Sequence, residues 1–459
     1  MITLKDGARV VLRGSHGWNE TNSERKREII RGIASGRATR GPVHAELDLT
    51  DRCNVACYFC NQQDVRTKDQ ISIEHLRRLI DELAQGGLRS VRLSGGGDPL
   101  AHRQAADVLD HLATRGIVVD NLTTNGALLT EDIARKLVDG RAREVIFSLN
   151  AVDANDYARM MQVRPAVFDR VIEAIRRLVA IRGESIYPSV VVQFLLDRRN
   201  FHEMPRMEAL GVSLGADRIA MGVVLDIPRE RIDAEILLVE SDGEAVRPYL
   251  EEILRRDRGR GLLQLNFPIS AWNAMLAEIK AQLDYPPEEN LFPTATSFRE
   301  ENGHCFFGWY TATIRGNGDL YPCCLLMTPD YKPLGNALQG SFRSHWNGPQ
   351  FRRLRSEMRE VMLDGESARF DPERHRVIRP QCVGYGMCWL KNMYFRGDEA
   401  FYAELAVAME KARRRAALSR LARQGWRFAR RVPPGLRRRA KSLFSRLAGS
   451  AQVPPASPG

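Results

Sequence analysis

The sequence predicts an α/β fold in which helices cover a parallel sheet. Between residues 43 and 224, six short apolar stretches typical of buried strands alternate with segments of amphipathic, helical periodicity. Such an alternation builds strand–helix–strand units, whose strands run parallel in one sheet with the helices outside it. The pattern alone leaves open whether the six units form an open sheet or a partial barrel.

The individual elements follow in order along the chain. A hairpin is expected around Asp6-Gly7, followed by a helix at 22–35. Ser72 is a typical N-cap for the helix after the first strand, and glycines mark its end. The six strands are expected at 43–49, 88–94, 117–124, 143–150, 188–196 and 216–224, and the helices at 72–87, 103–115, 130–138, 154–161, 166–182 and 201–211. Further helices are expected at 242–256, 269–283 and 396–431, with a strand at 262–267 and a linker at 285–297.

Length and composition bound the class of protein. The chain has 459 residues, of which 44% are hydrophobic and 27% charged, as in ordinary globular proteins. It contains no apolar run of about 18 residues that could span a membrane, and its N-terminus lacks the apolar core of a signal peptide. We therefore expect a cytoplasmic protein whose eight cysteines serve metal binding or catalysis rather than disulfides.

Three cysteines, Cys53, Cys57 and Cys60, lie within eight residues just after the first strand. Active sites of parallel α/β folds lie at the carboxyl ends of the strands, so these thiols are where chemistry is expected. A structural zinc site is the alternative, but it normally has four ligands and a C-x2-C knuckle. Three thiolates on a cubic iron–sulfur cluster would leave one iron free to bind a small molecule.

The C-x3-C-x-aromatic-C spacing, with Phe59 as the aromatic residue, resembles the defining motif of the radical S-adenosylmethionine (SAM) superfamily. The resemblance implies a partial (βα)6 TIM-like barrel and a [4Fe–4S] cluster held by Cys53, Cys57 and Cys60. It also implies that SAM binds the open iron and is cleaved reductively, giving a 5′-deoxyadenosyl radical that abstracts a substrate hydrogen. The electron would come from a reductant such as flavodoxin or ferredoxin.

Two further segments fit the same resemblance. "SGGGDPL" follows the second strand, where the family has a Gly-Gly-Glu-Pro motif that approaches the methionine part of SAM. The resemblance gives Gly95, Gly96 and Gly97 this role and places Asp98, in place of the usual glutamate, near the amino group. "FSLNA" ends the fourth strand, and there Ser148 and Asn150 would face the cofactor; polar residues that simply end a strand are the alternative. Gln193 on the fifth strand is a weaker candidate of the same kind.

The other five cysteines lie between 305 and 388, around the segment "GNGDLYPCC". This region resembles the SPASM/twitch auxiliary-cluster domain of radical SAM enzymes. Five cysteines suit one auxiliary [4Fe–4S] cluster, with the ligands Cys305, Cys323, Cys382 and Cys388; zinc at this site is the alternative. Cys324 is left over, although it could replace Cys323. A spare thiol can give a hydrogen atom to a carbon radical, whereas a buried apolar role is the simpler interpretation.

The charge of the chain is concentrated in its C-terminal part. The net charge is +11, yet 14 of the 68 Lys and Arg residues lie in 411–447, which contains no acid; the other 54 face 57 acids. After Pro434 apolar residues recur at helical spacing among arginines, and Trp426 and Phe428 precede them. We expect this tail to lie on an anionic membrane surface, at the inner face of the membrane. Contact with RNA and a solvated tail without a partner are alternatives.

Together these features predict five regions. They are an N-terminal hairpin and helix at 1–43, a radical SAM partial barrel at 44–225, a connecting α/β region at 226–302, an auxiliary-cluster domain at 303–395 and a basic helical tail with a disordered end at 396–459.

The expected function is net oxidation of a small polar or lipid-linked substrate by an oxidoreductase that uses SAM, its cluster and one auxiliary cluster. Only 43 residues precede the first barrel strand, which is short for a peptide-recognition domain. Three alternatives stay open. They are an epimerase or peptide maturase that uses Cys324 as hydrogen donor, an RNA-modifying enzyme, and a non-catalytic metal-binding adaptor.

Overall fold

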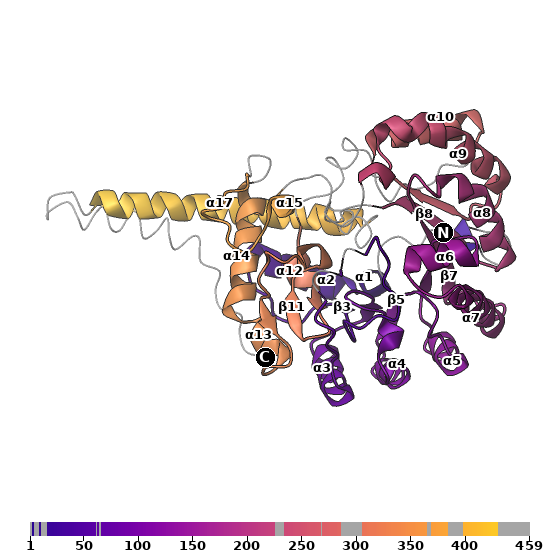
Figure 1. Ribbon diagram of the computed structural model, residues 1–459. Helices are drawn as coiled ribbons and strands as arrows, with labels where there is room; N and C mark the ends of the chain where they lie inside the picture. Colours follow the sequence, from indigo (N-terminus) through magenta and orange to yellow (C-terminus); the bar gives the residue numbers. More distant parts are fainter. Residues whose placement is uncertain are drawn as a thin grey trace.

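The computed structural model describes residues 2–3, 9–10, 16–60, 62–63, 66–224, 234–267, 269–285, 305–364, 369–383 and 398–429. A ten-stranded sheet runs through this part of the chain in the order β12-β11-β10-β3-β4-β5-β6-β7-β8-β9 (Figure 1). The six predicted strands are β3 (His44–Leu47), β4 (Ser90–Leu93), β5 (Val118–Thr124), β6 (Glu144–Ser148), β7 (Ser189–Leu196) and β8 (Arg218–Val223). They pair in parallel in chain order, so the predicted α/β fold is confirmed.

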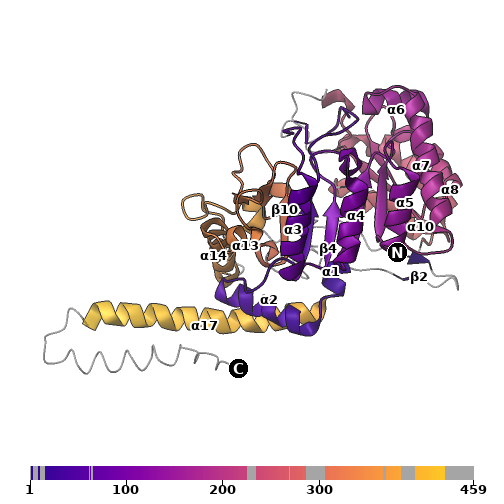
Figure 2. The same ribbon diagram turned by 90° about the horizontal axis from the view of Figure 1, so that it is seen from below.

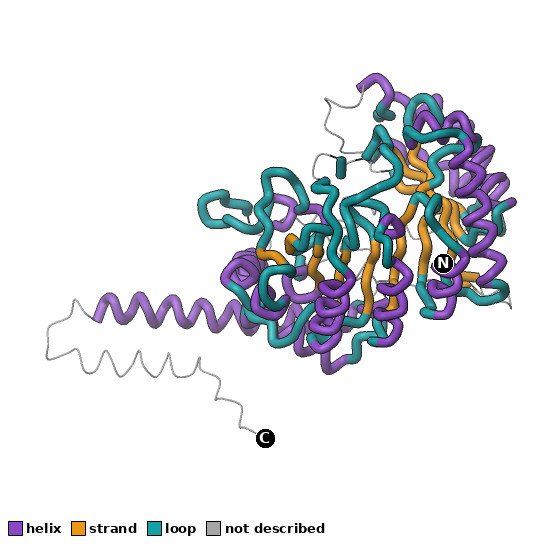
Figure 3. Tube along the Cα trace, turned by 60° about the horizontal axis from the view of Figure 1, so that its bottom comes forward, coloured by secondary structure: helices purple, strands orange, loops and turns teal. Residues whose placement is uncertain are grey.

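Helices cover one face of this sheet, as Figure 3 shows. They are α3 (Ile73–Gln85), α4 (Ala105–Thr114), α5 (Glu131–Asp139), α6 (Ala154–Met161), α7 (Ala166–Arg182) and α8 (Met204–Ser213). Ser72 caps α3 as predicted, since its side chain accepts a hydrogen bond from the backbone N–H of His75. The sheet and its helices form a partial (βα)6 barrel.

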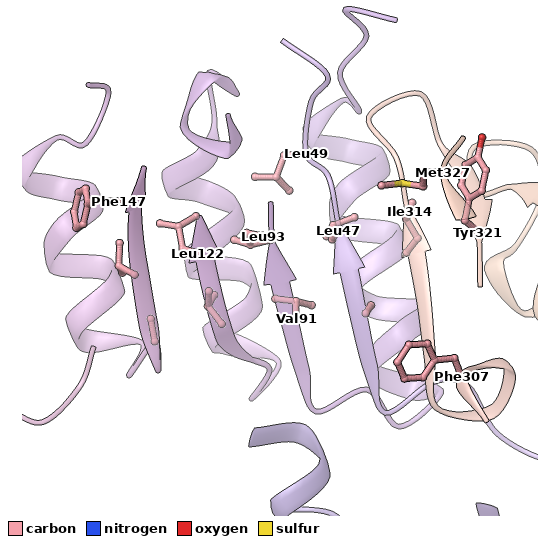
Figure 4. Close-up of a cluster of buried hydrophobic side chains, with 14 of the residues drawn as sticks. Leu47, Leu49, Val91, Leu93, Leu122, Phe147, Phe307, Ile314, Tyr321 and Met327 are labelled. Atoms are coloured by element: carbon pink, nitrogen blue, oxygen red, sulfur yellow. The ribbon is translucent and has the colours of Figure 1, made fainter. Parts of the chain in front are cut away.

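Alternate residues of each strand supply the core between sheet and helices. Leu47, Leu93, Leu122 and Phe147 are all at most 1% exposed, and Figure 4 shows them on neighbouring strands in front of the helices. Because successive side chains of a strand point to opposite faces, the residues between them lie on the inner face of the barrel. That inner face is the one available to a ligand.

The sheet extends beyond the six predicted strands at both edges. β9 (Leu263–Asn266), the strand expected at 262–267, pairs in parallel with β8, and α9 (Gly243–Asp257) and α10 (Ser270–Gln282) flank it. At the other edge β10 (Thr311–Ile314) pairs in parallel with β3, and β11 (Asp319–Tyr321) and β12 (Gly335–Asn336) continue it antiparallel. The hairpin of the second cysteine region is therefore part of the barrel sheet, whereas the sequence suggested a separate unit.

A helix of the N-terminal region and a helix of the C-terminal region meet below the strands. α2 (Ser23–Ser35) packs against α17 (Glu399–Ala429), and the rest of α17 projects past the body (Figure 2). Trp18 of α1 (His16–Asn19) joins them, because its ring contacts Phe401 edge-on at 4.6 Å and Tyr310 of α12 (Phe307–Tyr310) at 5.4 Å. The expected N-terminal hairpin is present as β1 (Ile2–Thr3) paired antiparallel with β2 (Arg9–Val10).

The remaining helices follow β12. They are α13 (Phe342–Trp346), α14 (Pro349–Asp364) and α15 (Pro380–Val383). Most of the linker expected at 285–297 and the helix expected after Pro434 lie outside the described residues. Within the described residues, no helix is both long and apolar enough to cross a bilayer.

Candidate active site

The loop after β3 brings the three clustered thiols together at the carboxyl end of the barrel. Burial, together with the neighbouring Cys60 and Cys53, raises the pKa of Cys57 to about 12. Burial also raises the pKa of Cys53, with Cys60 again among the causes. The three thiols are therefore close enough to interact electrostatically, and their role as ligands of one cluster stays a prediction.

Arg66 supplies a positive charge beside these thiols. Its Nη2 donates to the Cys60 Sγ at 3.1 Å, and its Nε donates to the Gly96 carbonyl at 2.5 Å. The guanidinium thus ties the cysteine loop to the glycine loop. Sequence reasoning missed Arg66, because an arginine among other loop residues carries no spacing signal.

The glycine loop after β4 lies directly on the start of the cysteine loop. Gly95 has a φ of 123°, and a Cβ there would lie 1.8 Å from the Asp48 Oδ1. A Cβ on Gly96 would lie 2.1 Å from the Asp51 Oδ1, and one on Gly97 would lie 1.9 Å from the Arg52 carbonyl oxygen. Close approach of protein to protein therefore requires all three glycines, in addition to any approach of a ligand.

Asp98 joins three strand ends rather than standing free for a ligand. It is 4% exposed and accepts hydrogen bonds from the backbone N–H groups of Leu100 at 2.9 Å and Asn125 at 2.7 Å. The Thr124 hydroxyl and the Asn125 amide also donate to it. We expected Asp98 beside the amino group of SAM; the structure instead commits both of its oxygens to fixing the loop after β5.

Asn125 extends this network to the cysteines. Its side-chain amide and that of Asn54 exchange two hydrogen bonds, of 2.8 and 3.2 Å. Asn54 directly follows Cys53, so the loops after β3, β4 and β5 form one hydrogen-bonded unit. This unit was not predicted, because its members are about 30 to 70 residues apart in sequence.

Asn150 and Ser148, the two polar residues at the end of β6, have different surroundings. Asn150 is 1% exposed, has a left-handed φ of 55° and accepts a hydrogen bond from the Leu195 N–H, so it holds the backbone of β7. The amide oxygen of Asn150 therefore serves the fold, and the expectation that Asn150 faces the cofactor stays a prediction. Ser148 is only partly buried and pairs in register with Gln193 of β7, which places both on the inner face.

Phe59 lies in an apolar group at the far side of the mouth. Its ring contacts Tyr58 edge-on, with ring centroids 5.2 Å apart. It also packs in an apolar group with Val224, Leu195, Ile236 and Leu237. Tyr58 donates a short hydrogen bond to Asp197 at the end of β7. The cysteine loop therefore reaches across the mouth of the barrel from β3 to β7.

Three described cysteines of the second set lie beside buried tyrosine rings. Burial raises the pKa of Tyr331, and the nearby Cys382 and Cys323 raise it further, so these two thiols lie beside the same ring. Cys305 is buried and lies near Tyr402, whose pKa it helps to raise after burial and Asp398. Cys388, the fourth expected ligand, lies outside the described residues.

The Cys324 thiol has other neighbours than the Cys323 thiol. Burial raises the pKa of its thiol, followed by the carboxylate of Glu46 on β3, while the Arg92 guanidinium on β4 lowers it. Cys324 thus lies against the inner face of the barrel, which favours Cys323 as the auxiliary ligand.

Two family models match the chain, one over each of the two regions in which cysteines cluster. The model of the radical SAM superfamily matches residues 47–208, and that of the SPASM iron–sulfur cluster-binding domain matches residues 305–368. The chain contains a radical SAM domain followed by a SPASM domain.

Among curated relatives, the antilisterial bacteriocin subtilosin biosynthesis protein AlbA of Bacillus subtilis is 24% identical over 372 residues, covering 79% of this chain and 71% of AlbA. A probable GTP 3′,8-cyclase of Saccharolobus solfataricus is 30% identical over 174 residues, covering 38% of this chain. The chain spans about half the length of this cyclase, 54%.

Among solved structures, Streptococcus suis SuiB shares the fold of this radical SAM chain. Its TM-score is 0.52 at 16% identity, over 72% of each chain. The structure of anSMEcpe with bound AdoMet and a peptide gives a TM-score of 0.50 at 14% identity, over 81% of this chain and 96% of the other. At such identities the likeness concerns the fold alone.

A radical SAM domain implies a [4Fe–4S] cluster and SAM, and a SPASM domain implies auxiliary iron–sulfur clusters. The residue types present fit the first group, because the loop after β3 supplies three neighbouring thiols and Arg66 donates a hydrogen bond to one of them. Among the described residues, no three His, Cys, Asp or Glu side chains are grouped as ligands of one metal ion.

Proposed function

We propose that this radical SAM protein oxidises a small polar or lipid-linked substrate, with Cys53, Cys57 and Cys60 as ligands of the SAM-binding cluster. When bound, that cluster and SAM supply a 5′-deoxyadenosyl radical, which abstracts a substrate hydrogen atom. The observation that carries this proposal is the convergence of the three thiols, Arg66 and the glycine loop at one end of the barrel.

The chain's own residues have three tasks in this proposal. Arg66 donates a hydrogen bond to Cys60 and holds the glycine loop against the cysteine loop. Asp98 and Asn125 fix the three strand-end loops relative to one another, which keeps the sulfur donors in place. Ser148 and Gln193 present polar groups from the inner face, within the barrel that opens towards this end.

The SPASM region supports the oxidative outcome. Cys305, Cys323, Cys382 and Cys388 are the proposed ligands of the auxiliary cluster, which would supply an acceptor for the second electron of a two-electron oxidation. Cys323 and Cys382 already share the surroundings of Tyr331. The names of relatives favour other outcomes, since AlbA serves the biosynthesis of a peptide bacteriocin and the cyclases act on GTP.

A second candidate follows from the position of Cys324 beside Glu46. As a hydrogen donor, Cys324 would give its S–H hydrogen atom to a substrate carbon radical, which forms a C–H bond and leaves a thiyl radical. One electron from a ferredoxin- or flavodoxin-type reductant and one proton would restore the thiol. The net result is epimerisation.

The decisive experiment is release of 5′-deoxyadenosine from SAM by the reconstituted, reduced protein under anaerobic conditions. Release by the natural protein and none by Cys57→Ala supports the proposal. A protein that takes up no iron and releases no 5′-deoxyadenosine would indicate that the three cysteines have a structural role.

Cys324→Ala separates the two outcomes. Lost turnover with unchanged iron content and unchanged 5′-deoxyadenosine release supports the hydrogen-donor function. Lost iron would make Cys324 an auxiliary ligand, and unchanged turnover leaves oxidation as the outcome.

A further inference from the structure

A belt of polar side chains crosses the inner face of the barrel. The register of the sheet pairs Glu46 with Arg92 and Arg92 with Asn121 on β3, β4 and β5, and the other members come from β6, β8 and β9. Each flanks a core residue of its strand, such as Leu47 or Leu93, and therefore points away from the helices. The belt consists of Glu46, Arg92, Asn121, Glu144, Arg218 and Gln264.

Opposite charges and amides alternate along this belt. Arg92 lies 3.5 Å from Glu46, whose other oxygen accepts a hydrogen bond of 2.9 Å from Thr313 on β10. Further along, the Asn121 amide donates to Glu144 at 2.8 Å, and Arg218 forms a short ion pair with the same carboxylate. Arg218 also donates to the Gln264 side chain at 3.4 Å.

The belt is open to solvent and adjoins the proposed site. The side chains of Arg92, Glu144 and Arg218 keep 21 or 22% of their surface exposed although they lie inside the barrel. Glu46 is two residues before Asp48, whose carboxylate accepts a hydrogen bond from Gly96 in the glycine loop at 3.0 Å. Two residues on one face of a strand are separated by about 7 Å, so the belt lies one step below the glycine loop.

The charges of the belt balance. It holds two carboxylates and two guanidiniums, and the nearby Asp51 and Arg315 form their own pair at 2.9 Å. A nucleoside triphosphate needs a surplus of Lys, Arg or metal charge around its phosphates, and the belt offers none. An acyl chain would leave these buried polar groups without water, at a cost in free energy for each.

We infer that the part of the substrate that enters this barrel is an uncharged polyol ring, such as a sugar or cyclitol. Hydroxyl groups donate and accept at once, so a polyol can insert among alternating carboxylates, amides and guanidiniums without upsetting their pairing. Ile146 of β6 lies on the same face, two residues after Glu144, and offers an apolar contact to the C–H face of a ring. This inference rests on the proposed function, because it places the ring below the radical-generating site.

Binding to the full-length, reconstituted protein in the presence of SAM tests the inference. The probes are myo-inositol, glucose, N-acetylglucosamine and GTP, and binding is followed by calorimetry and by thermal unfolding under anaerobic conditions. At least one of the three ring compounds is expected to bind and raise the Tm, and GTP is expected to do neither. Binding of GTP, or binding of none of the ring compounds by a protein that binds SAM, would overturn the inference.

Variants locate the binding. Asn121→Ala and Gln264→Ala each remove one belt amide and keep both ion pairs, so each should weaken polyol binding by about tenfold and leave SAM affinity unchanged. Asn155→Ala, on the exposed surface of α6, is the matched control and should change neither affinity. Equal polyol affinity in all three variants contradicts a site at the belt. Iron content and 5′-deoxyadenosine release are measured on the same samples, so failure of the proposed function is recognised separately.

Discussion

Arg315 and Asp51 form a buried ion pair, in which Nη2 and Oδ2 are 2.9 Å apart and the side chains are 5 and 0% exposed. Arg315 follows β10 in the SPASM region, and Asp51 lies two residues before Cys53. The backbone of the two regions meets at the same place, since a Cβ on Gly316 would lie 2.5 Å from the Asp51 nitrogen. The hairpin of the auxiliary region therefore supports the loop that carries the first three cysteines.

Replacing one partner of this pair should destabilise the protein strongly. Arg315→Met leaves the Asp51 carboxylate buried without its cation, which typically costs about 3–5 kcal/mol. Urea unfolding of the apoprotein measures the loss. The double variant Asp51→Asn/Arg315→Met should be less destabilised than the sum of the single variants, and Arg135→Met, in an exposed pair on α5, should change stability by less than about 1 kcal/mol. Additive single effects would contradict a coupled pair.

Gly95 should tolerate no side chain. Gly95→Ala places a methyl group 1.8 Å from the Asp48 Oδ1 at a φ of 123°, so the glycine loop must move. We expect loss of SAM binding, measured by equilibrium dialysis against labelled SAM. Gly116→Ala is the matched control, because it also has a positive φ, 66°, but meets no atom within 4 Å, and it should lose only about 1 kcal/mol of stability and no SAM binding. Normal binding by Gly95→Ala would show that the loop does not contact SAM.

Much of this architecture could be predicted from sequence, and its limits have physical causes. Strands and helices were predictable because burial of one face imposes periods of 2 and 3.6 on local sequence. The pairing of β10 with β3 was not, because it joins residues more than 260 positions apart through backbone hydrogen bonds that any sequence can make. The thiols were predictable from their spacing, whereas Arg66, Asn54 and Asn125 act through contacts that have no fixed spacing.

Asp48 should make the stability of the apoprotein fall as pH rises. Burial raises its pKa well above the ordinary value of 3.8, against the lowering effect of the Gly96 N–H. The folded protein then binds a proton that the unfolded chain releases above pH 3.8, so this contribution to stability is present at low pH and is lost as the pH rises towards the native pKa. Urea unfolding between pH 4 and 8 should show that the free energy of unfolding declines less steeply with pH in Asp48→Asn than in the natural protein, because the asparagine has no proton to lose. Parallel curves for the two proteins would mean that Asp48 is ionised in the folded state.

Arg66 should set the pH at which the first cluster assembles. Thiolates are the ligands, and burial raises the pKa of Cys53 and Cys57, so the nearby guanidinium favours the ionised form. Arg66→Met should slow iron incorporation at neutral pH by up to about tenfold for each unit by which the thiol pKa rises, with recovery at higher pH. Arg52→Met is the control, because its guanidinium donates to the Lys68 carbonyl instead of a thiol. An unchanged pH profile for Arg66→Met would make Arg66 a purely mechanical link.

The basic end of the chain should bind anionic bilayers. Phe401, Leu405, Met409 and Ala412 anchor the first half of α17, and from Arg413 to Leu418 the helix has no buried residue. Sequence from 411 to 447 adds 14 basic residues and no acid, and each basic residue near an anionic surface contributes about 1 kcal/mol of attraction. We propose that the protein binds phosphatidylglycerol vesicles, that 0.5 M salt weakens binding because it screens the charges, and that a chain ending at residue 432 binds less. Flotation with phosphatidylcholine vesicles is the control. Retention of RNA in place of vesicles would assign the tail to the RNA alternative, and equal binding by the shortened chain would exclude residues after 432 as the contact.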